Sequence, residues 1–469
     1  MKRLILPLAT AAILLPAPLP AAKPTPAKKK TVERAIKLAD ETPEAFLGSE
    51  RVITLERAFE RALGTDQSIR LAYYAIRRAN LRPWRALTTL GPSLTGNMSY
   101  QSSSRYSLTD PAVEWSRTDT VNRSAGITFV QPLFDPTVIP AYRHGKLTAR
   151  SARLQYQYTI RETLFGVAQA YYNVLKQQRL VEVNQITEQL AQEQLEQAKA
   201  RYEVGEVARI DVLRAQATLE EARHQVILSK GNLEVAKNTL SNILNLGGDT
   251  NFTLKEPANF PAPGLSFEEA LRQAYANRED LKISLLAVEQ EKMARQELIA
   301  SYSPRITAQA SAQWGSVSGA NSGRNEVHAG VISVQMPFLT GGQREIDIRN
   351  AGHLIREAEI RVENTAKAIE ADVKEAWVNV TAGQKSLEAL SATVAASEQN
   401  YADIKSQYEA GTATSLDVQV ALKELSNARA MLTNQFYDLQ IALRDFERAK
   451  GTLEQERVHR KSGLPLIQF

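Results

Sequence analysis

The chain contains two successive copies of one structural plan, and this repeat limits its possible folds more than any other feature of the sequence. Leu55–Ala58 (LERA) returns as Phe267–Ala270 (FEEA), and Tyr202–Gly205 (YEVG) returns as Tyr408–Gly411 (YEAG). Matches that keep their order along the whole body indicate a tandem duplication. We expect each copy to fold into a helix, two strands, a very long helix, a sharp turn and another long helix.

The N-terminus has the order of a secretory signal peptide. Basic Lys2 and Arg3 precede an almost unbroken apolar run from Leu4 to Leu15, and prolines and small residues follow. The run is about 12 residues long, shorter than the roughly 20 of a transmembrane helix, and a retained anchor is the alternative. The predicted domain plan is a signal peptide at 1–22, a basic, proline-rich segment at 23–50, repeat 1 at 51–246, a linker at 247–265, repeat 2 at 266–450 and a tail at 451–469.

Heptad spacing marks the second half of the second copy. Apolar residues recur at steps of three, four or seven from Leu422 to Phe446, and the preceding helix repeats this spacing from Leu387 to Tyr408. Such spacing places one apolar seam along each helix and predicts coiled-coil packing. The stretch from Arg344 to Tyr408 has no proline, and a helix of roughly 60 residues is about 90 Å long. This length predicts a pillar or a tube, because a compact core does not need it.

Alternation with period two marks the strands. Three segments show it clearly: Ser93–Gln101, Asn122–Phe129 and Arg305–Trp314. Around Val327–Val334 the alternation is poor and does not assign the faces. Segments of about ten alternating residues are typical of an outer-membrane barrel, and a soluble sheet with one wet face is the alternative. We expect polar loops between the strands of each pair, at Ser102–Thr120 and Gly315–Asn325.

The number of strands predicts an oligomer. Barrels of about eight strands fill their interior with side chains, so the four strands of one chain cannot enclose a conducting pore. Three chains together supply about twelve strands, which is enough for a channel. The polar faces, rich in Ser, Thr, Asn and Gln, then suit a wet lumen, and the apolar faces suit outer-membrane lipid.

Composition and motifs exclude several functional classes. The chain has no cysteine, and its formal charge of +5 includes six basic residues among the first 30, so the body is close to neutral and lacks the basic face of a nucleic-acid binder. The histidines are scattered, and no metalloprotease, nucleophile-elbow or phosphate-loop motif is present. We therefore expect no enzyme activity, no catalytic residue, no cofactor and no metal site.

A paired motif carries a family resemblance. Tyr-x-x-Gly-x-x-x-x-x-Asp-Val occurs at Tyr202–Val212 and at Tyr408–Val418, each time between long helices and after a pair of strands. This arrangement resembles the TolC-like outer membrane efflux protein family over roughly residues 51–450. The resemblance implies a mainly α fold with a small β part, in which coiled-coil helices form an α-helical barrel across the periplasm. It also implies a homotrimer, whose four strands per chain form a 12-stranded transmembrane β-barrel in the outer membrane.

The resemblance also implies a function and partners. The chain would be an exit duct for efflux or type I secretion, and an inner-membrane pump and a periplasmic adaptor would dock at the helical tip. In this topology the strand loops lie outside the cell and the helix turns lie in the periplasm. A periplasmic or secreted coiled-coil structural protein without a pore is the alternative.

Six residues of the two helix turns are the candidate site residues: Tyr202, Gly205, Asp211, Tyr408, Gly411 and Asp417. Glycine just past a helix commonly adopts the left-handed conformation, and a carboxylate in a first helical turn meets the positive end of the dipole. The resemblance implies that these residues form the periplasmic gate and the adaptor contact, and that Asp211 accepts a hydrogen bond from Tyr408. Val420 and Ala413 stand where relatives carry a second acidic ring and a basic latch, so the details of gating stay open.

Overall fold

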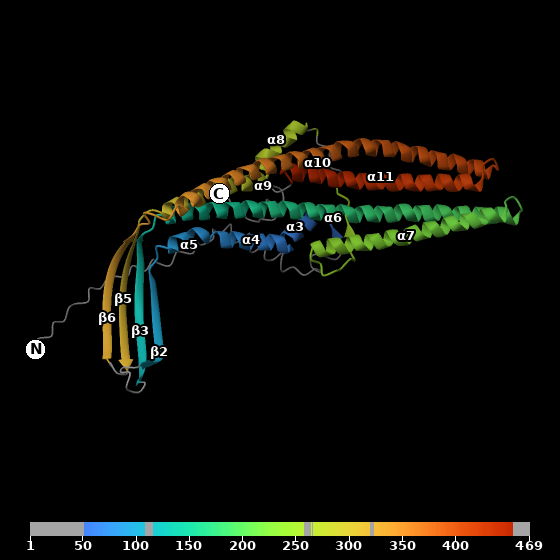
Figure 1. Ribbon diagram of the computed structural model, residues 1–469. Coiled ribbons are helices and arrows are strands. Elements are labelled where there is room, and N and C mark those ends of the chain that lie inside the picture. Colours follow the sequence, from blue (N-terminus) through green and yellow to red (C-terminus); the bar gives the residue numbers. More distant parts are fainter. Residues whose placement is uncertain (1–50, 108–115, 258–263, 265, 319–322, 454–469) are drawn as a thin grey trace, which may run out of the picture.

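The computed structural model describes residues 51–107, 116–257, 264, 266–318 and 323–453. The predicted signal peptide, the basic segment that follows it and most of the tail lie outside these residues. A long helical body dominates the molecule, and a narrow curved sheet projects from one end of it (Figure 1). The mainly α fold with a small β part, predicted from the sequence, is confirmed.

The order of elements is repeated in the two halves. The first half contains α3 (Leu55–Thr65), α4 (Gln67–Ala79), α5 (Arg82–Thr88), β2 (Ser93–Ser107), β3 (Ser116–Phe134), α6 (Val138–Glu203) and α7 (Arg209–Ile243). The second half contains α8 (Phe267–Asn277), α9 (Glu279–Ser301), β5 (Arg305–Ser318), β6 (Gly323–Gln335), α10 (Gln343–Glu409) and α11 (Ser415–Lys450). The first helix of each half begins at a hydroxyl cap, because Thr54 accepts from the Arg57 amide and Ser266 from the Glu269 amide.

The long helices pack through the predicted apolar seams. α6 and α10 contain 66 and 67 residues, which is about 100 Å each. Along α11 the buried seam includes Leu422, Leu425, Leu443 and Phe446. Near the far end of the body, side chains from α6, α7, α10 and α11 share one apolar cluster. The hairpin α6–α7 and the hairpin α10–α11 therefore lie side by side and end together, as Figure 1 shows.

The four long strands form one antiparallel sheet in the order β2-β3-β5-β6. The predicted loops were too long, because strand pairing continues to Ser107–Ser116 in the first pair and to Val317–Gly323 in the second. The register also assigns the faces of β6, which the sequence did not. Ile332 lies on the same face as Ala308, its partner on β5. That face of β6 also carries His328 and Glu326, so it is apolar on β2, β3 and β5 and mixed on β6.

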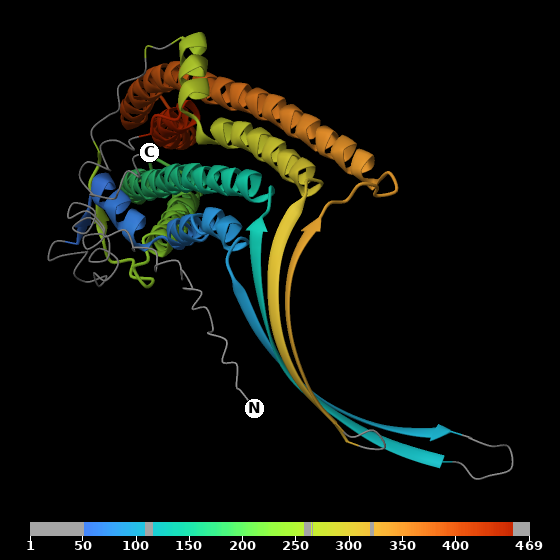
Figure 2. The same ribbon diagram turned by 90° about the vertical axis from the view of Figure 1, so that its left-hand side faces the viewer.

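The sheet is open in the single chain. β2 and β6 are its edges, and each has a described neighbour on one side only. Figure 2 shows the sheet curving away from the helices along its length. A long edge strand with unpaired backbone groups readily pairs with another chain.

A short parallel ladder lies in the segment predicted to be a plain linker. β1 (Val52–Ile53) pairs with β4 (Thr253–Leu254), so the junction between the two halves is fixed to the start of the first half. The buried Tyr171 hydroxyl of α6 lies 2.9 Å from the Ile53 carbonyl oxygen and 2.5 Å from that of Lys255. The boundaries of the two copies stay a prediction.

Ion pairs hold the helices together near the middle of the body. Asp372 of α10 accepts from Arg448 of α11 at 2.9 Å and also from Arg278, which precedes α9. Arg161 of α6 and Glu279 of α9 form a second pair, in which both side chains are buried. Within the described part of the chain, no helix has an apolar stretch long enough to cross a membrane.

Candidate functional site: the helical tip

Each long hairpin turns through a glycine in the left-handed conformation. Gly205 has φ 80° and Gly411 has φ 78°, and each lies two residues after its helix ends. The Gly205 amide donates to the Tyr202 carbonyl at 3.0 Å, and the Gly411 amide donates to the Tyr408 carbonyl at 3.1 Å. These are the bonds of a Schellman turn, which terminates a helix and satisfies its last carbonyls. The predicted structural role of both glycines is confirmed.

Asp417 closes a capping box at the start of α11. Its carboxylate accepts from the Thr414 hydroxyl at 2.6 Å and from the Thr414 amide at 2.8 Å, and its own amide donates to the Thr414 hydroxyl at 3.3 Å. These bonds favour the ionised form and lower the pKa of Asp417. Helix capping therefore accounts for Asp417.

Asp211 occupies the same position in α7 but has a different environment. The residue before this helix is Ala208, which has no side-chain oxygen, so no capping box forms here. Asp211 is half-buried, and its charge acts on Tyr408 of the other hairpin. The two aspartates are therefore equivalent in sequence but not in their contacts.

The two tyrosines of the paired motif also differ. Tyr408 is buried, with 4% of its surface exposed, whereas Tyr202 is 46% exposed. Burial raises the pKa of the Tyr408 phenol, the charge of Arg201 opposes this rise, and the charge of Asp211 adds to it. The expected hydrogen bond from Tyr408 to Asp211 does not form, since the buried Tyr408 hydroxyl has no hydrogen-bond partner among the described residues.

Arg201 joins the two turns in place of that bond. Its guanidinium donates to the carbonyl oxygens of Tyr408 and Glu409, both at 2.8 Å, and its central carbon lies 4.7 Å from the centroid of the Tyr408 ring. We call this set of contacts the tip contact. It combines a cation–π interaction with a positive charge at the C-terminal end of α10, where the helix dipole is negative.

Sequence reasoning missed Arg201, although one signal was available. Arg201 precedes Tyr202 in the first motif, and the second motif has the neutral Gln407 at the same position. A charged residue that is present in only one of two similar turns is a candidate for binding the other turn. The acceptors, however, are backbone carbonyls, which no sequence motif marks.

The comparison with known families decides the class of this fold. The model of the outer membrane efflux protein family matches residues 59–246 and 270–452, which together are most of the chain. The chain belongs to the outer membrane efflux protein family.

Relatives and solved structures of this family agree with the match. The outer membrane protein TolC of Vibrio cholerae serotype O1 is 28% identical over 351 residues, covering 71% of this chain and 78% of that protein. The Campylobacter jejuni CmeC outer membrane channel superposes with a TM-score of 0.69 at 18% identity, covering 88% and 90% of the two chains. The open state of the Neisseria gonorrhoeae MtrE outer membrane channel gives 0.65 at 20% identity, covering 86% and 90%. Outer membrane efflux proteins are channels and not a family of enzymes.

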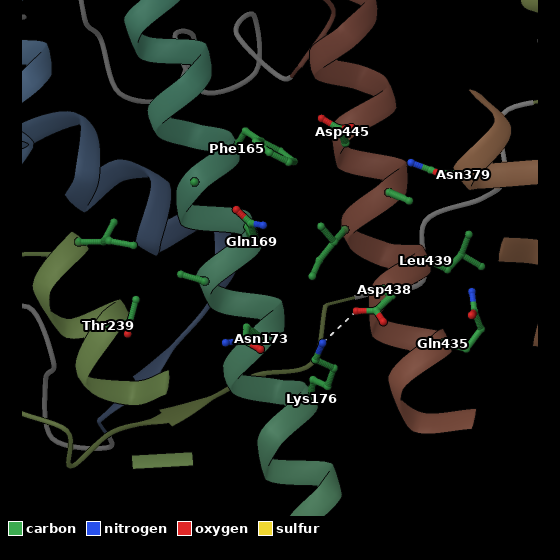
Figure 3. Close-up of a pocket in the computed structure, with 15 residues that line it drawn as sticks. Phe165, Gln169, Asn173, Lys176, Thr239, Asn379, Gln435, Asp438, Leu439 and Asp445 are labelled. Carbon is green, nitrogen blue, oxygen red and sulfur yellow. Dashed lines mark hydrogen bonds and ion pairs between the residues drawn. The ribbon is translucent and has the colours of Figure 1, made fainter. Parts of the chain in front are cut away.

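A groove lies between the two hairpins of this efflux-family chain. It has a volume of about 890 Å³ and lies between α6 and α11, away from the tip. Figure 3 shows Gln169 and Asn173 on one side and Asp438 on the other, with Lys176 donating to Asp438 at 2.9 Å. The lining mixes polar side chains with apolar ones such as Phe165 and Leu439, so the groove is only partly polar.

Proposed function

We propose that the protein is the outer-membrane exit duct of a tripartite efflux or type I secretion system. In this role it passes substrates from an inner-membrane pump and a periplasmic adaptor across the periplasm and the outer membrane. The observation that carries the proposal is an open four-stranded sheet joined directly to helices of about 100 Å. The sheet is suited to form a wall within a membrane, and the long helices are suited to form a conduit.

Closure of the sheet requires further copies of the chain. The free edges β2 and β6 are 15 and 13 residues long, and each can pair with the opposite edge of a neighbour. Four strands from each of three chains give a barrel of about twelve, wide enough for a lumen. The protein thus works as a homotrimer, with the face rich in Ser, Thr, Asn and Gln toward the lumen and the apolar face toward lipid.

The tip is the closed entrance and the surface on which the adaptor docks. Its proposed residues are Tyr202, Gly205, Asp211, Tyr408, Gly411, Asp417 and, from the structure, Arg201. Support comes from the tip contact, in which one arginine holds the end of α10 against the end of α6. Exposed Tyr202 offers an apolar ring at the same end of the molecule and is the candidate for the adaptor contact.

Membrane fractionation and mass measurement of the complex test this function. The mature protein should fractionate with the outer membrane, and the detergent-solubilised complex should have the mass of three chains and conduct ions in a planar bilayer. A stable monomer would contradict the barrel. A protein that stays soluble without detergent would favour the alternative of a coiled-coil structural protein.

A further inference from the structure

Two arginines lie in one row across the apolar face of the sheet, far from the helices. Arg123 of β3 and Arg324 of β6 both pair in register with Ser316 of β5, and Tyr100 of β2 pairs with Arg123. The row therefore consists of Tyr, Arg, Ser and Arg. Neighbouring strands are about 4.8 Å apart, so the two arginine side chains start about 10 Å from each other.

Both arginines line a cavity of about 560 Å³. Neither forms an ion pair with a described residue. The guanidinium of Arg123 lies over the Tyr100 ring, 5.7 Å from its centroid. The carboxylate in the adjacent row, Glu326, instead accepts from the Trp314 indole at 2.9 Å and lies 3.0 Å from the His328 ring. The N–H donors of both arginines are thus available to an anion.

On the helix side of this row the same face is apolar on β2, β3 and β5, whereas β6 places His328 and Glu326 on it. Successive rows place Ala125 beside Trp314, Ile127 beside Ala312, and Phe129 beside Ala310. The apolar face of β5 runs from Ile306 to Trp314. This segment is about as long as a tilted transmembrane strand, which needs about 9–11 residues. Aromatic rings at the end of such a band are typical of the boundary between hydrocarbon and headgroups. The arginine row lies one step beyond that boundary.

We propose that Arg123 and Arg324 bind the phosphate headgroup of a membrane lipid in the outer leaflet. The inference rests on the proposed function, which places the apolar face in lipid and the far end of the sheet outward. The acyl chains lie along the apolar rows, and phosphate oxygens accept the guanidinium N–H groups. Guanidinium groups fit phosphate through two parallel hydrogen bonds, and two of them about 10 Å apart suit a headgroup that carries two phosphates.

Lipid retention by the purified complex tests this proposal. The detergent-solubilised protein is mixed with lipid A, an acylated disaccharide with two phosphates, or with the same lipid after removal of its phosphates, and native mass spectrometry counts the bound molecules. The wild-type protein should retain the phosphorylated lipid and release the other. Arg123→Gln and Arg324→Gln should each weaken retention by about tenfold, as expected for loss of a charge-assisted contact. Arg105→Gln is the matched control, because Arg105 lies on the opposite face of the outer part of the sheet.

Three results would overturn the proposal. One is equal retention by the wild type and a variant that carries both Arg123→Gln and Arg324→Gln. Another is equal retention of the lipid with and without its phosphates. The third is complete displacement of the lipid by inorganic pyrophosphate at equal concentration, which would show a site for soluble anions. Conductance of the same preparations keeps the two proposals separate. A conducting channel that retains no lipid A rejects only this inference, whereas a preparation that never conducts rejects the proposed function as well.

Discussion

Arg201 makes the tip asymmetric at the level of a single side chain. In the first hairpin this position supplies a guanidinium, and in the second hairpin Gln407 supplies none. The phenol of Tyr408 contributes its ring and not its hydroxyl, because the hydroxyl is buried without a partner among the described residues. The motif predicted the right region, but not which of its atoms make the contact.

Arg201→Ala should therefore open the tip, and Tyr408→Phe should not. Loss of two charge-assisted bonds and one cation–π contact at a half-buried site removes about 2 kcal/mol from the closed state, which raises the proportion of open tips by roughly thirtyfold. Single-channel recording in a planar bilayer measures this as higher mean conductance. Gln407→Ala is the matched control at the equivalent position. A Tyr408→Phe channel that opens as widely as Arg201→Ala would show that the phenol hydroxyl carries the contact.

Ionisation of Asp372 makes the stability of the folded chain depend on pH. Burial opposes its ionisation, but the hydrogen bond from Arg278 and the charge of Arg448 outweigh burial, so the pKa of Asp372 lies below its ordinary value. A lowered pKa in the folded state means that the stabilisation is complete above the ordinary value of about 3.9 and is lost as the pH falls through the folded-state pKa.

Asp372→Asn should lower the melting temperature in detergent at pH 7 by the equivalent of about 1–3 kcal/mol. It should also flatten the fall of the melting temperature below pH 4, because Asn does not ionise. Asp438→Asn is the control, since it removes an exposed partner of Lys176, and exposed pairs contribute about 0–1 kcal/mol. Equal effects of the two substitutions would mean that the partial burial of the Asp372 ion pairs adds nothing to their contribution.

At the scale of elements, the sequence was most informative where one face of an element is apolar and the other polar. The heptads predicted the long helices, and alternation predicted the halves of the strands nearest to the helices. Beyond Gln101 the strand β2 reads SSSRYS, with polar residues on both faces, so alternation disappears although strand pairing continues. The ladder of β1 and β4 was missed because two-residue strands have no period to detect.

The unequal caps of the two hairpins allow a test within one chain. Ala208 has φ −80° and ψ 154°, close to the φ −92° and ψ 159° of Thr414, so a threonine fits there without strain. Ala208→Thr should build a capping box with Asp211 and slow amide exchange in the first turn of α7 by the equivalent of about 1 kcal/mol. Thr414→Ala should speed exchange in α11 by a similar factor. No change in either helix would show that the turns are held by contacts other than their caps.

At the scale of the whole molecule, the fold class followed from the repeat and from helix length. The tip contact did not, because it joins residues far apart in the chain and its acceptors are backbone oxygens. The helices and the sheet also lie at opposite ends of the molecule (Figure 1), which gives a direct test of orientation. The position Asn321, which the predicted topology also places outside, lies beyond the described residues.

Single cysteines at the two ends should label differently in whole cells. The chain has no cysteine of its own, so Ser107→Cys at the end of β2 and Thr412→Cys in the second turn are clean reporters. A membrane-impermeant maleimide should label the first from outside and reach the second only after the outer membrane is opened. The reverse pattern would overturn the proposed topology, and labelling of both in intact cells would argue against a membrane-inserted sheet.

The acceptors of Arg201 are main-chain oxygens, and this has a genetic consequence. Every amino acid supplies the same carbonyl, so codon changes at Tyr408 or Glu409 leave both acceptors in place, whereas most changes at Arg201 remove both donors at once. A selection for leaky cells would then recover lesions at codon 201 and few at codon 409. Substitutions that break this contact between the two halves should therefore concentrate in the first half of the chain.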